Sequence, residues 1–528
     1  MTRPWWRDAV VYQVYVRSFA SSGSRGGGPG VGDLPGITGR LPHLRDLGVD
    51  AVWITPFYTS PQHDHGYDVA DYLDVDRLFG SLDDADELLA TAHDLGLKVI
   101  VDLVPNHTSS EHAWFRAALD SPPGSPERAR YLFRDGRGPD GSEPPNNWQS
   151  VFGGDAWTRV PDGQWYLHLF DSTQPDLDWR HPEVGDMFEA VLRFWLDRGA
   201  DGFRVDVAHG LLKEESLPDQ ERVLPPPGPD SPPASPASMV ERTQVHEPMW
   251  DQPEVHDVYR RWHRVLEDYD GDRMTVAEAW TRTPELMARY VRPDEMQQAF
   301  NFAWLLAPWS AAAFAEVVTG TFDALEPVGA GPTWVLSNHD VVRHVTRYGG
   351  GAQGLARARA ATLTMLGLPG SSYLYQGEEL GLEQVDVAPE DRQDPSWFRT
   401  GEVGRDGCRV PVPWSGDAPP YGFGPGDAQP WIPQPADWAG LTVEAQTGAE
   451  GSTLEFYRAA LTARRALTPV DTVAVRVEGD VLLIERGDVT IALNCGASDA
   501  PLPAGRVLVA SGPIDGVLPG DTAVWLGR

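Results

Sequence analysis

Eight short runs rich in valine and isoleucine, separated by segments of helical periodicity, constrain the fold of this chain more than any other feature. Runs that are apolar on both faces suit the strands of a parallel sheet covered by helices. Eight such runs alternating with helices predict an α/β fold of the TIM (β/α)8 barrel type. The predicted strands are 10–16, 51–55, 98–104, 202–207, 274–277, 299–302, 333–336 and 371–375.

Two of the intervening helices have readable ends. Ser81 precedes an acidic first turn, and an apolar stripe then runs to Gly96, which predicts a helix between them. The segment 186–198 repeats the apolar stripe and stops at Gly199. Both helices lead directly into a predicted strand, as a barrel requires.

The spacing of the strands indicates insertions. The gap between the third and fourth strands is much longer than its neighbours, and its sequence is rich in Pro, Gly, Trp and Asp with little helical periodicity. After a helix at 454–466 the pattern changes to short alternating strands at 473–477, 481–484, 489–493 and 506–509. We therefore predict barrel segments 1–106 and 175–467, an inserted small domain 107–174, a proline-rich insertion 214–250 and a C-terminal antiparallel β domain 468–528.

Composition restricts the partners. A formal net charge of -34 argues against nucleic acid and against an anionic membrane, both of which are polyanions. Two cysteines, Cys408 and Cys495, are too few for a disulfide framework, and the N-terminus has no apolar run of signal-peptide length. These features predict a cytoplasmic protein that acts on a small neutral substrate. For the assembly, which they do not determine, the expectation is a monomer or a homodimer.

One predicted strand carries charge. In 202–207, Phe203 and Val205 alternate with Arg204 and Asp206, so the charged side chains share one face. Unpaired buried charges are costly, but an arginine two residues before an aspartate can keep that aspartate ionised. The pair is either a structural salt bridge or part of a reactive site, and this run alone leaves both interpretations open.

The ends of the other strands favour a reactive site. Reactive residues of such barrels lie at the C-terminal ends of the strands. Glu278 lies in an apolar setting that favours a neutral, proton-donating carboxyl, whereas Asp206 beside Arg204 would stay charged. One charged and one neutral carboxyl suit glycosidic cleavage; a metal site is the alternative, but no usual His spacing supports it and His63-Asp64-His65 better fits a site rim. The collected residues are Asp102, Asn106, His107, Arg204, Asp206, His209, Glu278, His339 and Asp340.

Four of these segments resemble the ordered signature regions of the α-amylase family, glycoside hydrolase family 13. They are 102–107, 202–206, 276–280 and 337–340, and 12–18 and 376–381 resemble the first strand and the end of the eighth. The segments Gln174-Pro175-Asp176-Leu177-Asp178-Trp179 and Gly404-Arg405-Asp406-Gly407-Cys408-Arg409 are similar to those that mark the α-glucosidase and oligo-1,6-glucosidase branch.

The resemblance implies a role for each matching residue. Asp206 would be the nucleophile, Glu278 the acid/base and Asp340 the third carboxylate that orients the sugar hydroxyls. Asp68 and Arg405 would pair across the pocket floor and grip a terminal glucose, so one sugar would be removed from a chain end. The other implied substrate-binding residues are Tyr67, His107, Arg204 and His339, with Phe152 and His209 on the leaving-sugar side.

The sequence departs from the family at one loop. Many relatives bind calcium after the first strand, but here the segment 24–33 keeps only Asp33 of the carboxylates. We predict neither metal nor cofactor. Val207 resembles α-1,6-cleaving relatives and the following 208–210 resembles α-1,4-acting glucosidases, and we favour α-1,4. The alternatives are a transglucosylase or a sucrose/trehalose-type isomerase of the same family, and a non-catalytic relative that only binds a partner.

Overall fold

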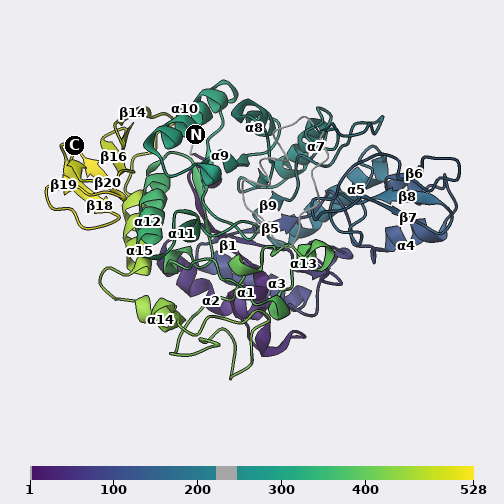
Figure 1. Cartoon of the computed structure of the whole chain (residues 1–528), viewed down its shortest axis with the longest axis horizontal. Coiled ribbons are helices and arrows are strands. Elements are labelled where there is room, and N and C mark those ends of the chain that lie inside the picture. The colour runs from purple at the N-terminus through teal and green to yellow at the C-terminus, as the bar shows by residue number, and fades with distance from the viewer. Residues whose placement is uncertain (1–2, 222–246) are drawn as a thin grey trace.

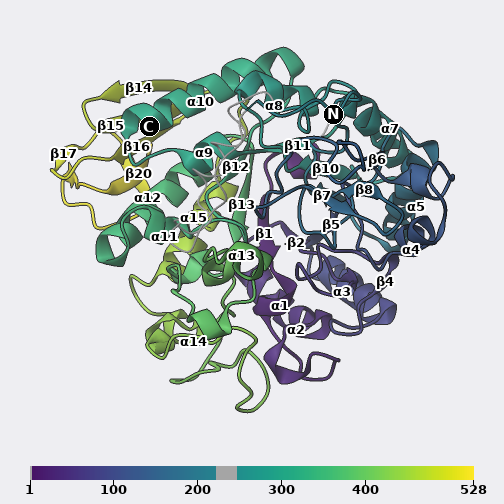
Figure 2. The same cartoon turned by 45° about the vertical axis from the view of Figure 1, so that its right-hand side comes forward.

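A computed structural model describes residues 3–221 and 247–528. Its centre is a closed barrel of eight parallel strands in the order β1-β13-β12-β11-β10-β9-β5-β2, which is seen at the centre of Figure 2. The predicted TIM barrel is confirmed. The strands are β1 (Val10–Val14), β2 (Ala51–Ile54), β5 (Lys98–Leu103), β9 (Gly202–Val205), β10 (Met274–Ala277), β11 (Gln298–Asn301), β12 (Thr333–Val335) and β13 (Ser371–Tyr375). The proline-rich stretches at 225–229 and 232–233 of the predicted insertion lie outside the described residues.

Local sequence explains where the barrel helices start and stop. Ser81 and Asp84 form a capping box at the start of α3, as an N-terminal Ser followed by an acidic residue predicts. Helix α5 begins four residues before the predicted position because Pro182 occupies its first turn, and it ends at Gly199 with φ 112°. The longer helices are α2 (Leu34–Leu47), α3 (Leu82–Asp94), α5 (Pro182–Arg198), α7 (Val255–Glu267), α8 (Pro284–Tyr290), α10 (Ala311–Leu325), α12 (Gly351–Gly367) and α15 (Thr453–Arg465).

Shorter helices and strands lie in the connections between the barrel strands and helices. A two-stranded sheet pairs β3 with β4 after the second barrel strand. The shorter elements are β3 (Tyr58–Thr59), β4 (Asp71–Val75), α1 (Val16–Phe19), α9 (Phe302–Leu306), α11 (His344–Arg347), α13 (Pro395–Thr400) and α14 (Val443–Gln446).

The segment inserted between β5 and β9 is more ordered than predicted. It contains α4 (Ala113–Asp120) and a sheet of β6 (Phe133–Asp135), β8 (Gln164–Leu167) and β7 (Trp157–Arg159). Trp148, Trp157 and Leu167 belong to a separate apolar core. The insertion and the C-terminal sheet lie at opposite ends of the molecule in Figure 1. The exact boundaries of the inserted domain, 107–174, stay a prediction.

The C-terminal sheet follows the predicted strands but contains one more. Its order is β14-β15-β16-β20-β18, so β20 lies between two predicted strands. Its six residues follow Pro519-Gly520-Asp521, a turn signal that marks the start of the strand. The elements are β14 (Ala474–Glu478), β15 (Val481–Arg486), β16 (Val489–Asn494), β18 (Arg506–Ala510) and β20 (Thr522–Gly527), with β17 (Ala500–Pro501) paired to β19 (Val517–Leu518).

Trp525 of β20 joins this sheet to the barrel. It is fully buried, its indole donates to the Leu363 carbonyl of α12, and Gly367 leaves room for the ring. We expect Trp525→Ala to lower the free energy of unfolding by about 3–5 kcal/mol, because it removes a large packed side chain. Thermal melting checks this, with exposed Val477→Ala as the matched control; equal melting temperatures for the two variants would contradict it.

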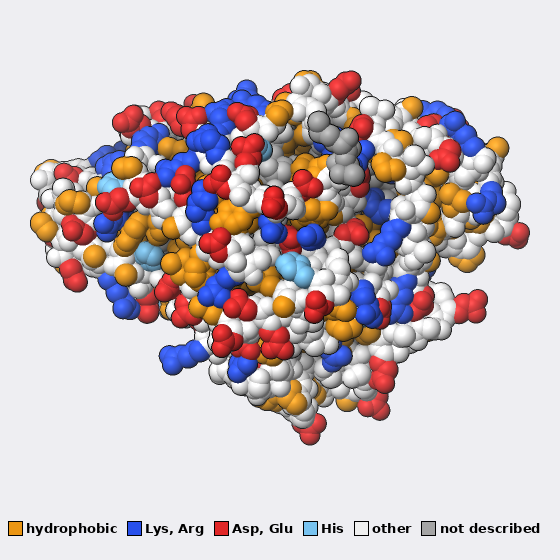
Figure 3. All heavy atoms as spheres, turned by 180° about the vertical axis from the view of Figure 1, so that it is seen from behind, with side chains coloured by type: hydrophobic (Ala, Val, Ile, Leu, Met, Phe, Trp, Pro, Cys, Tyr) orange, Lys and Arg blue, Asp and Glu red, His pale blue; other side chains and the backbone are white. Residues whose placement is uncertain are grey.

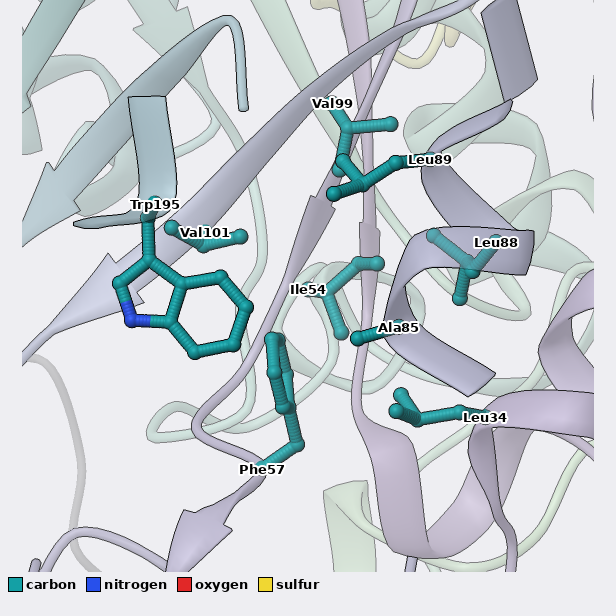
Figure 4. Close-up of a pocket in the computed structure, with 9 residues that line it drawn as sticks. All are labelled: Leu34, Ile54, Phe57, Ala85, Leu88, Leu89, Val99, Val101 and Trp195. Carbon is teal, nitrogen blue, oxygen red and sulfur yellow. The ribbon is translucent and has the colours of Figure 1, made fainter. Parts of the chain in front are cut away.

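A small interior cavity and the charge distribution on one face do not themselves indicate a ligand site. The cavity in Figure 4 measures about 10 Å³ and is bordered by apolar side chains, so it is a packing gap and not a sugar site. On the face in Figure 3, acidic and basic side chains are interspersed. None of the helices in 3–221 and 247–528 combines the length and apolar character needed to cross a membrane.

Candidate active site

One guanidinium at the C-terminal end of the barrel binds three carboxyl groups. Arg204 Nη1 lies 3.0 Å from Asp102 Oδ1 and 2.6 Å from Asp206 Oδ1, and its Nη2 lies 2.6 Å from Glu278 Oε2. The barrel register explains this grouping, since Asp102 on β5 and Val276 on β10 both lie opposite Arg204 on β9. The predicted grouping of these residues at one mouth is therefore seen in the structure.

The charges of this cluster do not balance. Burial raises the pKa of Asp102 to about 7 and that of Asp206 well above its usual range, against the opposing charge of Arg204. Glu278 and Asp102 raise the pKa of Asp206 further. Arg204 lowers the pKa of Asp206, as expected, but burial and the neighbouring carboxyls of Glu278 and Asp102 oppose it, because one guanidinium is shared by three carboxyls. The ionisation of Asp206 and that of Asp102 are therefore linked through their shared contact with Arg204.

Asp340 has the opposite environment. Its Oδ1 lies 3.0 Å from both Arg405 Nη1 and Arg409 Nη2, and its Oδ2 lies 3.2 Å from His339 Nε2. Burial alone would raise the pKa of Asp340, but His339, Arg405 and Arg409 together outweigh burial and lower it. Asp340 is therefore ionised throughout the ordinary pH range.

Aromatic rings hold His339 in place. The His339 ring stacks on Tyr67, with 5.3 Å between the ring centroids, and on Tyr15, with 5.6 Å between the ring centroids. Gln13 Nε2 lies 2.6 Å from its Nδ1. Tyr67 also donates its hydroxyl to Asp102 Oδ2 at 3.2 Å, which connects the two carboxylate groups of the mouth.

Arg405 pairs with Asp64, which corrects the predicted pair with Asp68. Arg405 Nη2 lies 2.9 Å from Asp64 Oδ1, and its Nε lies 2.6 Å from Asp394 Oδ2. Asp68 instead accepts hydrogen bonds from the Ser60 hydroxyl and from the backbone N–H groups of His63 and Asp64. Through these hydrogen bonds, the Asp68 carboxylate holds the conformation of the loop that contains Asp64.

The remaining predicted residues lie around this cluster. Burial lowers the pKa of His107 to about 4, and its Nε2 lies 3.1 Å from the Tyr67 carbonyl. The Phe152 ring lies against the guanidinium of Arg405, 5.0 Å from centroid to Cζ. His209 stacks on Trp250 at 4.9 Å, and burial lowers its pKa to about 3. Both histidines are therefore neutral near pH 7.

Several residues at this mouth escaped prediction. Asp394 and Arg409 complete the network around Arg405 and Asp340, and Trp53 donates its indole N–H to Asp102 at 3.0 Å. Arg409 could have been found, because it closes the segment 404–409 that resembles the family. Asp394 and Trp53 carry no local signal, since their partners are distant in the sequence.

Metal ligation has little support from the side chains that are present. Across the described part of the chain, no three His, Cys, Asp or Glu side chains are grouped as a metal ion requires. Asp33, the remnant of the calcium loop, accepts from Gly36 N–H and caps α2. In His63-Asp64-His65, the Asp64 carboxylate is already engaged by Arg405.

Comparison with known proteins agrees with this geometry. The family model described as alpha amylase, catalytic domain, matches residues 13–471. A probable alpha-glucosidase of Rhizobium meliloti (strain 1021) is 40% identical over 473 residues, covering 88% of this chain and 83% of that protein. An oligo-1,6-glucosidase of Parageobacillus thermoglucosidasius is 36% identical over 502 residues, covering 88% and 84%. The crystal structure of the alpha-glucosyl transfer enzyme XgtA superimposes with a TM-score of 0.88 at 38% identity over 100% of both chains.

Proposed function

The chain belongs to the alpha-amylase family and is a glycoside hydrolase, and on that premise we propose that it is a retaining, exo-acting α-glucosidase. Its proposed substrates are short α-glucosides, from which it releases glucose at the non-reducing end, with α-1,4 links preferred to α-1,6. The observation that carries the proposal is the shared guanidinium of Arg204 between Asp206 and Glu278.

This shared guanidinium supports a double displacement. Retaining glycosidases need their two carboxyls about 5–5.5 Å apart, whereas inverting enzymes leave room for a water between them. Asp206 attacks the anomeric carbon while Glu278 protonates the departing oxygen. Glu278 then takes a proton from water, whose oxygen displaces Asp206, so the anomeric configuration is kept. Asp340, held ionised by Arg405 and Arg409, orients the hydroxyls of the same sugar.

The ion pairs of Arg405 support removal of a single terminal sugar. Arg405 connects Asp64 to Asp340 and carries Phe152 against its face, so one end of the pocket is closed by charged, hydrogen-bonding groups. Such a floor suits the hydroxyls at the far end of a terminal glucose. On this proposal the floor leaves no space for a substrate chain beyond this sugar, which favours release of a terminal glucose over cleavage inside long chains.

The corrected role of Asp64 gives a matched test. We expect Asp64→Asn to lower kcat/KM on maltose about 10–100-fold with little change in melting temperature, because a charged partner of Arg405 is lost. Asp68→Asn should lower the melting temperature, because the carboxylate holds backbone N–H groups of the loop. If Asp68→Asn lowered kcat/KM on maltose more than Asp64→Asn does, and left the melting temperature unchanged, Asp68 would be the sugar-binding residue.

A second function, transfer of glucosyl groups, is favoured by the likeness to XgtA. Transfer and isomerisation use the same carboxylates and differ in whether water or a sugar reaches the intermediate. The test is product analysis on maltose, isomaltose, sucrose, trehalose and nitrophenyl α-glucoside at low and high concentration, with the anomer followed by NMR. Free α-glucose as the main product supports the hydrolase; mostly transfer or isomer products, or β-glucose, would overturn it.

The proposed compartment is a reducing cytoplasm, and the proposed assembly is a monomer or homodimer. Both cysteines are free, and Cys408 is buried beside the site, where its thiol contacts the carbonyls of His339 and Arg405. Size-exclusion chromatography with light scattering measures the assembly directly.

A further inference from the structure

The two carboxyl oxygens of Glu278 have different partners. Oε2 accepts hydrogen bonds from Arg204 Nη2 at 2.6 Å and from the Val207 backbone N–H at 3.0 Å. Oε1 accepts one hydrogen bond, from the Trp280 indole N–H at 3.2 Å. A carboxyl oxygen offers two acceptor positions, so both positions of Oε2 are taken and one position of Oε1 is left.

We propose that Glu278 carries its catalytic proton on Oε1 and that Trp280 is the positioning residue that holds this oxygen toward the departing sugar. The inference rests on the proposed role of Glu278 as acid/base. Trp280 acts only through Glu278, and its indole N–H is a donor that the family resemblance does not assign to any step.

The backbone of Val207 explains why Oε2 cannot exchange places with Oε1. Val207 has φ 47°, a left-handed conformation that is strained for a β-branched residue. This conformation lies directly after Asp206, where the Val207 N–H donates to Oε2. The next N–H, that of Ala208, donates to the Glu278 carbonyl. The turn therefore fixes both the backbone and one carboxyl oxygen of Glu278.

Packing fixes the indole on the other side of the carboxyl group. The Trp280 ring is 6% exposed and stacks on Phe302 with 3.8 Å between centroids and 7° between planes. Phe302 lies at the start of α9, directly after β11, so the stack joins the ends of two neighbouring strands. The indole cannot turn away without losing this contact.

The proton balance shows where the indole N–H contributes. In the first step the proton leaves Oε1 for the glycosidic oxygen as the bond to the departing sugar breaks and the bond from Asp206 to the anomeric carbon forms. Oε1 becomes anionic, and its hydrogen bond from Trp280 strengthens. In the second step water attacks the anomeric carbon, its proton returns to Oε1, and the bond to Asp206 breaks. The indole therefore stabilises charge that develops during the first step.

The test is Trp280→Phe, which keeps a ring against Phe302 and removes the N–H donor. We expect kcat/KM to fall about 10–100-fold on maltose, the size of one hydrogen bond to a charged group. On 2,4-dinitrophenyl α-glucoside the fall should be less than about threefold, since that leaving group departs without a proton. Because both substrates meet the same folded protein, their ratio is independent of any loss of folding.

Phe302→Leu is the companion variant, because it loosens the stack and keeps the donor. It should show the same loss on maltose as Trp280→Phe in a weaker form, with less than about threefold loss on 2,4-dinitrophenyl α-glucoside. An equal loss on both substrates for Trp280→Phe, or no loss on either, would overturn the inference. Failure of the proposed function looks different: the wild type would release no glucose, or Glu278→Gln would cleave maltose as the wild type does.

Discussion

Asp206→Asn should lower kcat on nitrophenyl α-glucoside by about 10⁴-fold or more, because the amide cannot form the covalent intermediate and the uncatalysed route through water is slow. Glu278→Gln should lose about 10²–10⁴-fold on maltose and much less on dinitrophenyl α-glucoside, because only the poorer leaving group needs a proton. Steady-state kinetics on the two substrates measures both effects.

The matched control is Asp86→Asn, which changes a surface pair with Arg198 far from the mouth. It should keep wild-type kinetics, since such exposed pairs contribute little. The nucleophile assignment fails if Asp206→Asn turns over nitrophenyl α-glucoside at the wild-type rate. The acid assignment fails if Glu278→Gln loses the same factor on both substrates.

The barrel could be predicted because its signal is local. Strands buried on both faces read as continuous apolar runs, and caps such as Ser81 with Asp84 mark the start of a helix within four residues. Strand β20 also has a local signal, since Pro519-Gly520-Asp521 precedes a short apolar run, but its place between β16 and β18 is set by pairing across the sheet.

The sequence predicted which residues lie close together in the candidate site. It did not predict which side-chain groups form ion pairs with one another. Strand-end position brought Arg204, Asp206 and Glu278 together, and the structure has them in contact. The carboxylate that pairs with Arg405 depends on the conformation of a loop. In this loop Asp68 accepts a backbone hydrogen bond, and Asp64 forms the ion pair with Arg405. Protonation depends on the sum of neighbouring charges, which spacing along the chain does not report.

Arg204→Leu is expected to abolish turnover and to lower the free energy of unfolding by about 3–5 kcal/mol at pH 8. The reason is that Asp102, Asp206 and Glu278 then lie buried without their shared cation. Removing one partner of a buried pair leaves an uncompensated charge, which is a larger loss than the net contribution of the pair. Urea unfolding measures the change, and Arg193→Leu, which removes an exposed pair with Asp268, should change it by less than about 1 kcal/mol.

The pH dependence of this variant separates lost charge from lost packing. Burial already raises the pKa of Asp102 to about 7 in the presence of Arg204, and without that opposing charge the pKa of Asp102 rises further. A carboxyl whose pKa is raised by folding gives stability that is fully present below its unfolded pKa of about 4 and is lost as the pH rises through its folded pKa. The difference between Arg204→Leu and the wild type should therefore be small near pH 4.5 and grow toward pH 8. A difference that stays constant over this range would mean that Arg204 stabilises the barrel by packing and not by its charge.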